Sequence, residues 1–403
     1  MPDPQAELFA FTWPEGGPHP TTRPEIVGTL GVVTSTHWLA SAAGMAMLEQ
    51  GGTAFDAAVA AGFVLQVVHP HLNGLGGEVP ILFAARDGIP RVLCGQGVAP
   101  AAATPGYFHA LGLDAVPGTG LLPAVVPGAF DAWMLLLRDY GTMTLDRVLG
   151  PALGYAARGY PIHADTCGII ASVERLFRTE WPSSAALWLP GSRIPLPNTL
   201  VTNPDLARTY ARLLAEASAA TGREAQIDRA RDAFYRGFVA ETIAQFVRSP
   251  VLDVSGGRHT GLIAAADLAN WQATYEAPIT HDYRGLTVCK CGPWTQGPVL
   301  LQLLALLESD DIANLDPLGP DFIHLWVEAA KLAFADREAF YGDPNFTAVP
   351  LEDLLSPAYT AARRALITGQ ASEAVNVSRH CRLGLGLGGS WLLGWCRVRQ
   401  RRT

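Results

Sequence analysis

A glycine-rich elbow, Asn73-Gly-Leu-Gly-Gly77, holds the residues of this sequence best suited to chemistry. Before it, Asp56 opens a run of alanines and valines that predicts a closely packed helix. Pro70 ends that helix because proline has no backbone N–H to donate. The three glycines of the elbow permit backbone conformations that side chains forbid, so their N–H groups could approach a ligand closely. A tight helix-to-strand turn is the simpler interpretation of the same residues.

Three further patterns have the residue types of metal or nucleotide sites but lack the context. His69 and His71 could pair on a metal, although core or turn histidines explain them more simply. Cys289-x-Cys291 has no matching second pair, so zinc is not expected. Gly384-x-Gly386-x-x-Gly389 fits a dinucleotide pattern only formally, because no strand and helix flank it. We therefore expect no metal and no cofactor.

Composition excludes several classes of protein. The chain has 403 residues, enough for a large core, and 49% of them are hydrophobic, yet no run approaches the roughly 18–20 apolar residues of a membrane span. A net charge of −8 argues against a general nucleic-acid binder. The N-terminus has no basic region followed by an apolar stretch, as a secretory signal would, and the six cysteines are too scattered for a disulfide framework. A cytoplasmic protein fits these features.

Hydrophobic spacing and turn residues predict the elements around the elbow. We expect a strand at 31–34, a helix at 35–50, and a β-hairpin at 79–94 that turns at Asp87-Gly88. Residues 106–129 are rich in loops. A strand is expected at 283–290, and further helices at 129–140, 145–158, 203–219, 225–248, 266–271, 299–308 and 321–341. Strands near both ends with helices between them favour a layered α/β or α+β sandwich over a repeat protein.

Ten segments, taken in order, resemble the large subunit of the gamma-glutamyltransferase family of N-terminal-nucleophile hydrolases. They are Leu39-Ala-Ser41, Gly51-Gly52 with Asp56-Ala-Ala-Val59, Asn73-Gly-Leu-Gly-Gly77, Ala99-Pro100, Val126-Pro-Gly128, Tyr140-Gly-Thr142, Gly261-Leu262 with Asp267-Leu268, Tyr283-Arg-Gly285, Glu328-Ala-Ala-Lys-Leu-Ala-Phe-Ala-Asp-Arg337 and Gly342-Asp-Pro344. The resemblance covers residues 25–373, and so many segments in the right order are not expected by chance.

This resemblance implies a fold and a mechanism. Members form a four-layer αββα sandwich from a precursor that cuts itself into a large and a small subunit, so we expect an α+β large-subunit part that is incomplete at its C-terminus. The cut frees a threonine at the start of the small subunit. Its hydroxyl attacks an amide or gamma-glutamyl carbonyl while its α-amine acts as the base. Backbone N–H groups hold the oxyanion, and the acyl group passes to water or to an amine.

One departure from the family concerns substrate binding. In gamma-glutamyltransferases an Arg-Glu pair precedes the Ala-Pro that matches Ala99-Pro100, and that arginine grips the α-carboxylate of the substrate. Here Gln96 stands in its place, and a neutral amide cannot replace a bidentate arginine contact at equal strength. Gln96 could also merely line a loop.

The elbow and the segment Pro293-Trp-Thr-Gln-Gly-Pro298 resemble an acylase-like branch of the superfamily. That branch includes cephalosporin (glutaryl) acylases and oxamate amidohydrolases. We expect four residues to shape the acyl-binding pocket: Gln96, Asn73, Gly76 and Gly77. Glu78, Arg284 and Asp336 receive no chemical role, because core ion pairs and turn carboxylates explain them equally well.

The second departure lies at the C-terminal end. The family continues into a linker and then the nucleophilic threonine, followed by histidine and a strand. Residues 375–403 contain no Asp or Glu but six arginines, and no stretch resembles that threonine segment. Such a change of composition is typical of a GC-rich gene translated out of frame, although a divergent natural C-terminus is the alternative. We therefore divide the chain into an N-terminal arm (1–24), a large-subunit domain (25–374) and an aberrant tail (375–403).

These observations lead to one functional hypothesis with two alternatives. The chain is expected to be a gamma-glutamyltransferase-like large subunit that contains no catalytic residue of its own and needs a small subunit for activity. Its parent activity would be the transfer or hydrolysis of gamma-glutamyl compounds such as glutathione. The first alternative is an amidohydrolase or acylase of small dicarboxylic monoamides, and the second is a non-catalytic remnant. Truncation of the sandwich would also expose sheet edges and lower solubility.

Overall fold

The computed structural model describes residues 25–373, which form two compact units. The first unit comprises residues 25–74 and 137–230, and the second comprises 75–136 and 231–373. The chain passes from one unit to the other at the elbow and again within helices α4 (Ala129–Tyr140) and α9 (Arg223–Tyr235). The expected arm at 1–24 and the tail at 375–403 lie outside the described residues.

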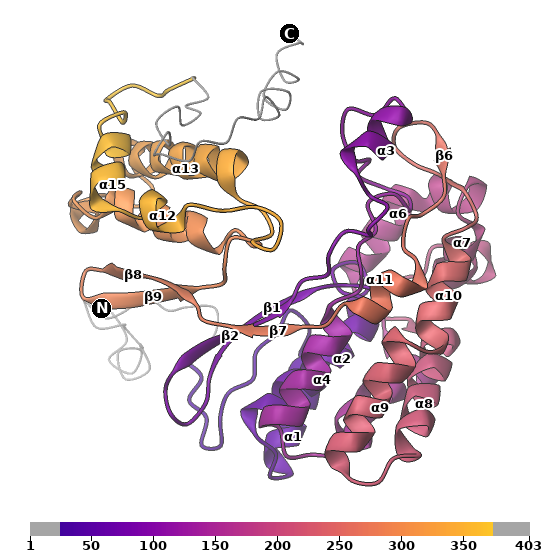
Figure 1. Cartoon of the computed structure of the whole chain (residues 1–403). Helices are drawn as coiled ribbons and strands as arrows, with labels where there is room; N and C mark the ends of the chain where they lie inside the picture. The colour runs from indigo at the N-terminus through magenta and orange to yellow at the C-terminus, as the bar shows by residue number, and fades with distance from the viewer. Residues whose placement is uncertain (1–24, 374–403) are drawn as a thin grey trace, which may run out of the picture. The chain divides into compact units, whose positions relative to one another are not determined.

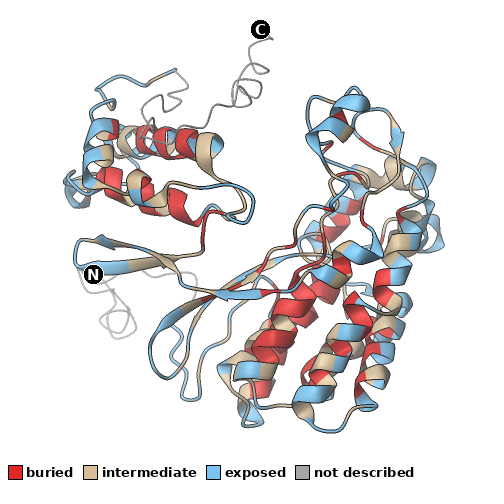
Figure 2. Cartoon of the chain, viewed as in Figure 1, coloured by how far each residue is buried: buried red, intermediate tan, exposed pale blue. Residues whose placement is uncertain are grey.

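Helices dominate the first unit. Helix α2 (Ala54–Val68) packs against α1 (Trp38–Glu49) and α5 (Leu145–Arg158), and α5 packs against α8 (Pro204–Ser218). Most of α2 is buried, as Figure 2 shows, because its small side chains let neighbouring helices approach closely. The remaining elements of this unit are α6 (Ala164–Thr179), α7 (Pro182–Trp188), the 3-10 helix η2 (Pro190–Ser192), and the paired strands β3 (Tyr160–Pro161) and β4 (Leu200–Val201).

The second unit contains the longer strands (Figure 1). Strands β1 (Val79–Ala84), β2 (Pro90–Gly95) and β7 (Thr274–Glu276) form an antiparallel sheet in the order β1-β2-β7. Two hairpins accompany it, β5 (Val251–Leu252) with β6 (Arg258–His259) and β8 (Ile279–Tyr283) with β9 (Leu286–Lys290).

Helices of the second unit lie before and after these strands. They are α3 (Pro105–Ala110), α10 (Phe238–Phe246), α11 (Ala265–Asn270), α12 (Gly297–Leu307), the 3-10 helix η3 (Ile312–Asn314), α13 (Pro320–Phe340), α14 (Leu351–Leu354) and α15 (Pro357–Arg364). One core cluster joins α12 and α13 through Leu303, Leu306, Leu307, Ala329 and Leu332. The described fold therefore mixes α and β structure, with its helical and strand-rich parts in separate stretches of the chain.

Several predicted elements have the observed bounds, and others need correction. The helices at 129–140 and 145–158 are confirmed as α4 and α5, and the first strand of the hairpin as β1. The strand expected at 31–34 is wrong, because those residues carry no strand pairing. The single helix expected at 225–248 is interrupted at Gly237, the N-cap of α10, where a Cβ would lie 2.8 Å from the Ala233 carbonyl oxygen.

The strand expected at 283–290 is the second arm of a hairpin, not a lone strand. Strand β8 was missed, and Arg284 and Gly285 form the two-residue turn between β8 and β9 with φ of 50° and 83°. Two residues with positive φ match the twist of antiparallel strands. Within residues 25–373, no helix is both long enough and apolar enough to cross a membrane.

Candidate functional site

Capping residues set the start of helix α2, and Pro70 sets its end just before the elbow. The side chains of Thr53 and Asp56 form a capping box at the start of α2, and the helix ends at Val68, two residues before Pro70. Asn73 donates its backbone N–H to the carbonyl oxygen of His69 (3.1 Å), which continues the turn beyond the helix. Asn73 belongs to the first unit, whereas the other three expected pocket residues belong to the second.

The elbow glycines do not have the backbone conformation that their number suggested. None of Gly74, Gly76 and Gly77 has the positive φ that only glycine adopts easily. A Cβ added to Gly76 would meet no described heavy atom within 4 Å, and this residue is exposed. Gly77 has an architectural role, since its carbonyl oxygen accepts the N–H groups of Gly128 (3.0 Å) and Ala129 (2.9 Å) at the start of α4.

Gln96 is held by Glu78, the residue directly after the elbow. Val79 faces Gly95 in the β1–β2 ladder, so Glu78 and Gln96 are the next opposing pair at the open end of the hairpin. Nε2 of Gln96 donates to Oε2 of Glu78. An ionised carboxylate only accepts hydrogen bonds, so this contact orients the amide with Nε2 toward Glu78. Glu78 thus has a defined contact with the candidate substrate-binding residue.

Glycines on either side of Gln96 hold its backbone in place. A Cβ on Gly97 would overlap the carbonyl oxygen of Val126, and a Cβ on Gly95 would lie 2.6 Å from the carbonyl oxygen of Val79. Val126 in turn donates its N–H to the carbonyl oxygen of Val98 (3.0 Å). Residues 95–98 and 126–128 therefore lie in close main-chain contact, and this contact fixes the backbone of Gln96.

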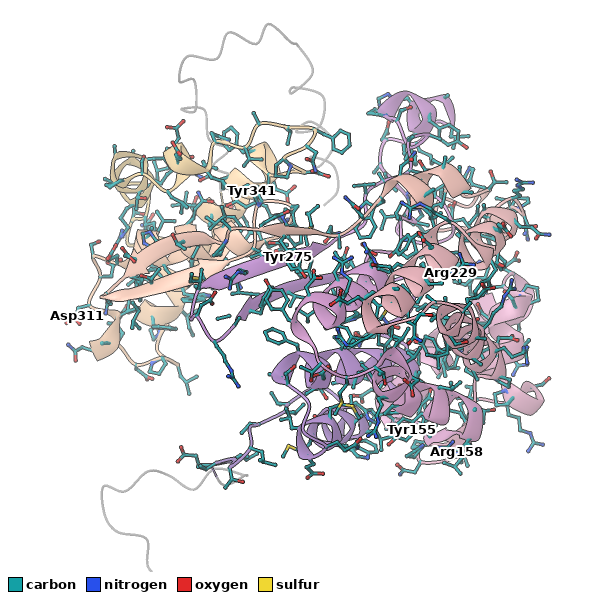
Figure 3. The ribbon with its side chains drawn as sticks, turned by 60° about the horizontal axis from the view of Figure 1, so that its bottom comes forward. Tyr155, Arg158, Arg229, Tyr275, Asp311 and Tyr341 are labelled. Atoms are coloured by element: carbon teal, nitrogen blue, oxygen red, sulfur yellow. The ribbon has the colours of Figure 1, made fainter. Side chains whose placement is uncertain are left out.

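Strand β7 lies beside β2 and brings the tryptophan segment near it. Cys94 faces Thr274 in the ladder, and Glu276 accepts a hydrogen bond from Nε1 of Trp294 (2.8 Å). Tyr275, labelled in Figure 3, donates its hydroxyl to the carbonyl oxygen of Leu135 in α4 (3.3 Å). Glu276 was not predicted as a site residue, because a carboxylate in a three-residue strand belongs to no recognisable motif.

Cys94 is not a nucleophile. Burial raises the pKa of its thiol to about 12, opposed by a backbone hydrogen bond from Gln96 and reinforced by Glu276 and Asp343. A thiol with such a pKa stays protonated at neutral pH.

Asp56 is the most completely satisfied carboxylate described in the first unit. It is fully buried and accepts hydrogen bonds from the backbone N–H groups of Thr53 (2.7 Å), Thr142 (2.9 Å) and Met143 (2.9 Å). Burial alone would raise its pKa, but these bonds outweigh burial and lower it. A Cβ on Gly141 would lie 2.6 Å from Oδ1 of Asp56, which explains glycine there. Two of the ten segments that resemble the family, 56–59 and 140–142, thus contact each other through one structural carboxylate.

The histidines near the elbow cap and pack against helices. Nδ1 of His69 lies 3.1 Å from Oγ1 of Thr36, and Nδ1 of His71 lies 2.9 Å from Oγ1 of Thr166. Burial, together with His69 and His163, lowers the pKa of His37 to about 4. Among residues 25–373, no three His, Cys, Asp or Glu side chains are grouped as ligands for a metal ion.

Arg284 and Asp336 have structural partners. Arg284 occupies the β8–β9 turn and donates to the carbonyl oxygens of Glu308 and Asp310. Asp336 is buried and pairs with Arg363 (3.0 Å). Tyr341, also labelled in Figure 3, donates its hydroxyl to Oε1 of Gln302 (2.6 Å), whose Nε2 bonds Asp336 (2.9 Å). These contacts hold α12, α13 and α15 together and offer no reactive group.

Comparison with known proteins places these features in a family. A family model described as gamma-glutamyltranspeptidase matches residues 40–383. The chain is 33% identical to the glutathione hydrolase-like YwrD proenzyme of Bacillus subtilis (strain 168), over 83% of this chain and 59% of that protein. It is 34% identical to the acylase ACY 1 proenzyme of Pseudomonas sp. (strain SE83), over 86% of this chain and 60% of that protein. The chain thus spans about three fifths of these relatives' length.

Solved structures agree with the sequence matches. The structure of LmbA2991HD has 56% sequence identity and a TM-score of 0.83, covering 88% of this chain and 60% of that chain. The gamma-glutamyltranspeptidase of Helicobacter pylori has 28% identity and a TM-score of 0.77, covering 89% of this chain and 99% of the matched chain.

Proposed function

The chain belongs to the gamma-glutamyltranspeptidase family, and we propose that it is the large-subunit part of an N-terminal-nucleophile hydrolase that acts on gamma-glutamyl compounds or other acyl amides. Relatives named glutathione hydrolase and acylase proenzymes support this proposal. In it, residues 25–374 are the large-subunit domain of a four-layer αββα sandwich, and 375–403 are an aberrant tail.

The reaction divides between this chain and a small subunit. The small-subunit threonine adds its hydroxyl oxygen to the substrate carbonyl, the amine leaves with the proton, and an ester forms. Water or an acceptor amine then cleaves that ester and restores the hydroxyl. The described residues supply binding groups: Gln96 and the elbow residues Asn73, Gly76 and Gly77 shape the acyl pocket, and the catalytic group comes from outside residues 1–403.

One observation carries the choice between the two candidate activities. Gln96 presents an amide where a gamma-glutamyl enzyme would place a guanidinium, and its Nε2 is already bonded to Glu78. A bidentate grip on an α-carboxylate is therefore missing from this position, and loss of such a charge-assisted pair weakens binding substantially. This favours an acylase or amidohydrolase activity over gamma-glutamyl transfer.

Complementation tests the proposal. Residues 1–403 are purified alone and after co-expression with the part of LmbA2991HD beyond its match to this chain. We expect no turnover by residues 1–403 alone, since the threonine comes from the small subunit. With the complementing part, acyl p-nitroanilides should be hydrolysed, and gamma-glutamyl-p-nitroanilide should be a poorer substrate than other acyl donors.

Each other outcome has a clear meaning. Robust gamma-glutamyl turnover would reject the acylase preference. Turnover by residues 1–403 alone would reject the division of labour between two subunits. Absence of turnover in a folded complemented complex would favour the non-catalytic remnant, and sequencing the locus for a small-subunit frame would then test it directly.

A further inference from the structure

We propose that four histidines of the first unit form an acid-sensitive junction, which holds the starts of α1 and α6 beside the end of α2 while the rings are neutral and opens locally at mildly acidic pH. The four are His37, His69, His71 and His163, and all belong to the unit made of residues 25–74 and 137–230. This inference goes beyond the proposed function, because the junction needs neither a substrate nor a small subunit and is tested without any turnover.

Two of these histidines cap helices and must be neutral to do so. His37 is the N-cap of α1, and its Nδ1 accepts a hydrogen bond from the backbone N–H of Leu39 (3.2 Å). His163 is the N-cap of α6, and its Nδ1 accepts from the backbone N–H of Asp165 (3.3 Å). A protonated imidazole carries N–H groups on both ring nitrogens and accepts no hydrogen bond. Protonation therefore removes both caps and places a positive charge at the positive end of each helix dipole.

The other two histidines connect the end of α2 to both of these helix starts. His69 is the C-cap of α2, and its Nδ1 lies 3.1 Å from Oγ1 of Thr36, just before α1. Nδ1 of His71 lies 2.9 Å from Oγ1 of Thr166 in the first turn of α6. A threonine hydroxyl can donate to a neutral ring nitrogen or accept from a protonated one, so these two contacts hold the rings at close spacing in either charge state.

The rings are too close together and too deeply buried to carry several charges. The ring centroids of His69 and His71 are 4.4 Å apart, and His37 lies 6.1 Å from His69 and 6.4 Å from His163. His37 is only 2% exposed and stacks on Trp38 at 4.0 Å. Among the described residues, Nε2 of His37 has no hydrogen-bond partner. A charge on this ring would be poorly solvated, unpaired and close to two rings that can also become positive.

The groups that act on the rings determine the direction of the pH effect. Burial, followed by His69 and His163, lowers the pKa of His37 from its ordinary 6.5 to about 4, with no carboxylate opposing the shift. Burial also lowers the pKa of His69 and His71, although Asp165 opposes it at both rings. Asp165 is exposed and lies 3.4 Å from Nδ1 of His163, so it offsets part of a charge there. The open form, with ordinary histidines, therefore binds more protons, and opening becomes easier as the pH falls below 6.5.

Hydrogen–deuterium exchange of residues 1–403 tests the junction. After correction for the intrinsic exchange rate at each pH, peptides from the three joined segments (37–44, 65–72 and 163–170) should lose protection by about tenfold or more between pH 7 and pH 5. The lowered pKa of His37 alone supplies this factor. Peptides from α12, in the second unit, should keep their protection within about threefold. Unchanged protection in the three segments, or an equal loss in α12, would overturn the proposal.

Two variants and one control identify the rings responsible. In H37N, asparagine can still accept the N–H of Leu39 but does not titrate, so the loss of protection at the start of α1 should shrink to about threefold. H69N removes the ring between His37 and His71 and should reduce the loss in all three segments. H109N, at an exposed position in α3, is the matched control and should behave as the wild type. Melting curves at pH 7 would verify folding, and H69N decides the question if H37N does not fold. An unchanged loss of protection in the folded variants would overturn the role of the histidines.

Discussion

Asp56 and Glu78 are two carboxylates on either side of the elbow, and the structure uses them in opposite ways. Asp56 is fully buried, and N–H groups from two separate segments point at it. Glu78 is exposed and orients a neighbouring amide. A buried carboxylate with its acceptor sites occupied stabilises the fold, whereas an exposed one on a rigid support remains accessible to a ligand. The comparison separates a buried carboxylate that stabilises the fold from an exposed one in the same short stretch of chain.

The largest expected effect comes from removing Asp56. D56A should lower the free energy of unfolding by about 3–5 kcal/mol, because the backbone N–H groups of Thr53, Thr142 and Met143 lose their acceptor inside the protein. Urea denaturation would measure the loss. D87A, in an exposed turn, is the control and should have a much smaller effect. Equal losses of unfolding free energy in both variants would show that Asp56 stabilises the fold no more than an exposed carboxylate does.

The next effect distinguishes two kinds of glycine near Gln96 and the elbow. G97A should cost about 2–3 kcal/mol, because its Cβ would overlap the Val126 carbonyl oxygen and a backbone segment must move. G76A should change stability by less than about 0.5 kcal/mol, since its Cβ would meet no described atom within 4 Å. Thermal unfolding of both variants would test this. A large loss in G76A would indicate that the elbow is packed more tightly than described.

A pH titration of stability sharpens the role of Asp56. Its pKa is lowered below the ordinary value of 3.8, so the folded protein holds the ionised form more strongly than the unfolded chain. The stabilisation is therefore present above about pH 4 and is lost as pH falls through the lowered pKa. D56N should lose less stability than the wild type between pH 5 and pH 2. Parallel curves of unfolding free energy against pH for the two proteins would contradict a lowered pKa at Asp56.

The smallest expected change in stability concerns Glu78. E78Q should alter the free energy of unfolding by less than about 0.5 kcal/mol, because exposed polar pairs contribute little. Chemical denaturation of E78Q and of the wild type would measure this difference. A stability loss comparable to that of D56A would place Glu78 among the structural carboxylates.

Local patterns predicted much of the chain. The periodic apolar residues of α4 and α5 and the stop at Pro70 depend on interactions within a few residues, so the sequence contains the necessary information. The helix break at Gly237 was missed because the apolar spacing continues across it. The need for glycine there comes from close contact with the backbone of Ala233, which the sequence pattern does not show. The elbow glycines were expected to have backbone conformations that side chains forbid, but none of them has a positive φ, and Gly77 instead accepts two hydrogen bonds from the start of α4.

The sequence by itself determined the family and the strands of the β1–β2 hairpin, and it named Gln96 as a candidate binding residue. Only the tertiary structure decided the register of that hairpin, in which Ala84 faces Pro90 across a loop of several residues and Glu78 consequently comes opposite Gln96. A two-residue turn at Asp87-Gly88 would shift the pairing by one position and turn every side chain to the other face. Register depends on contacts between distant segments, here 95–98 with 126–128, and no local pattern in the sequence specifies them.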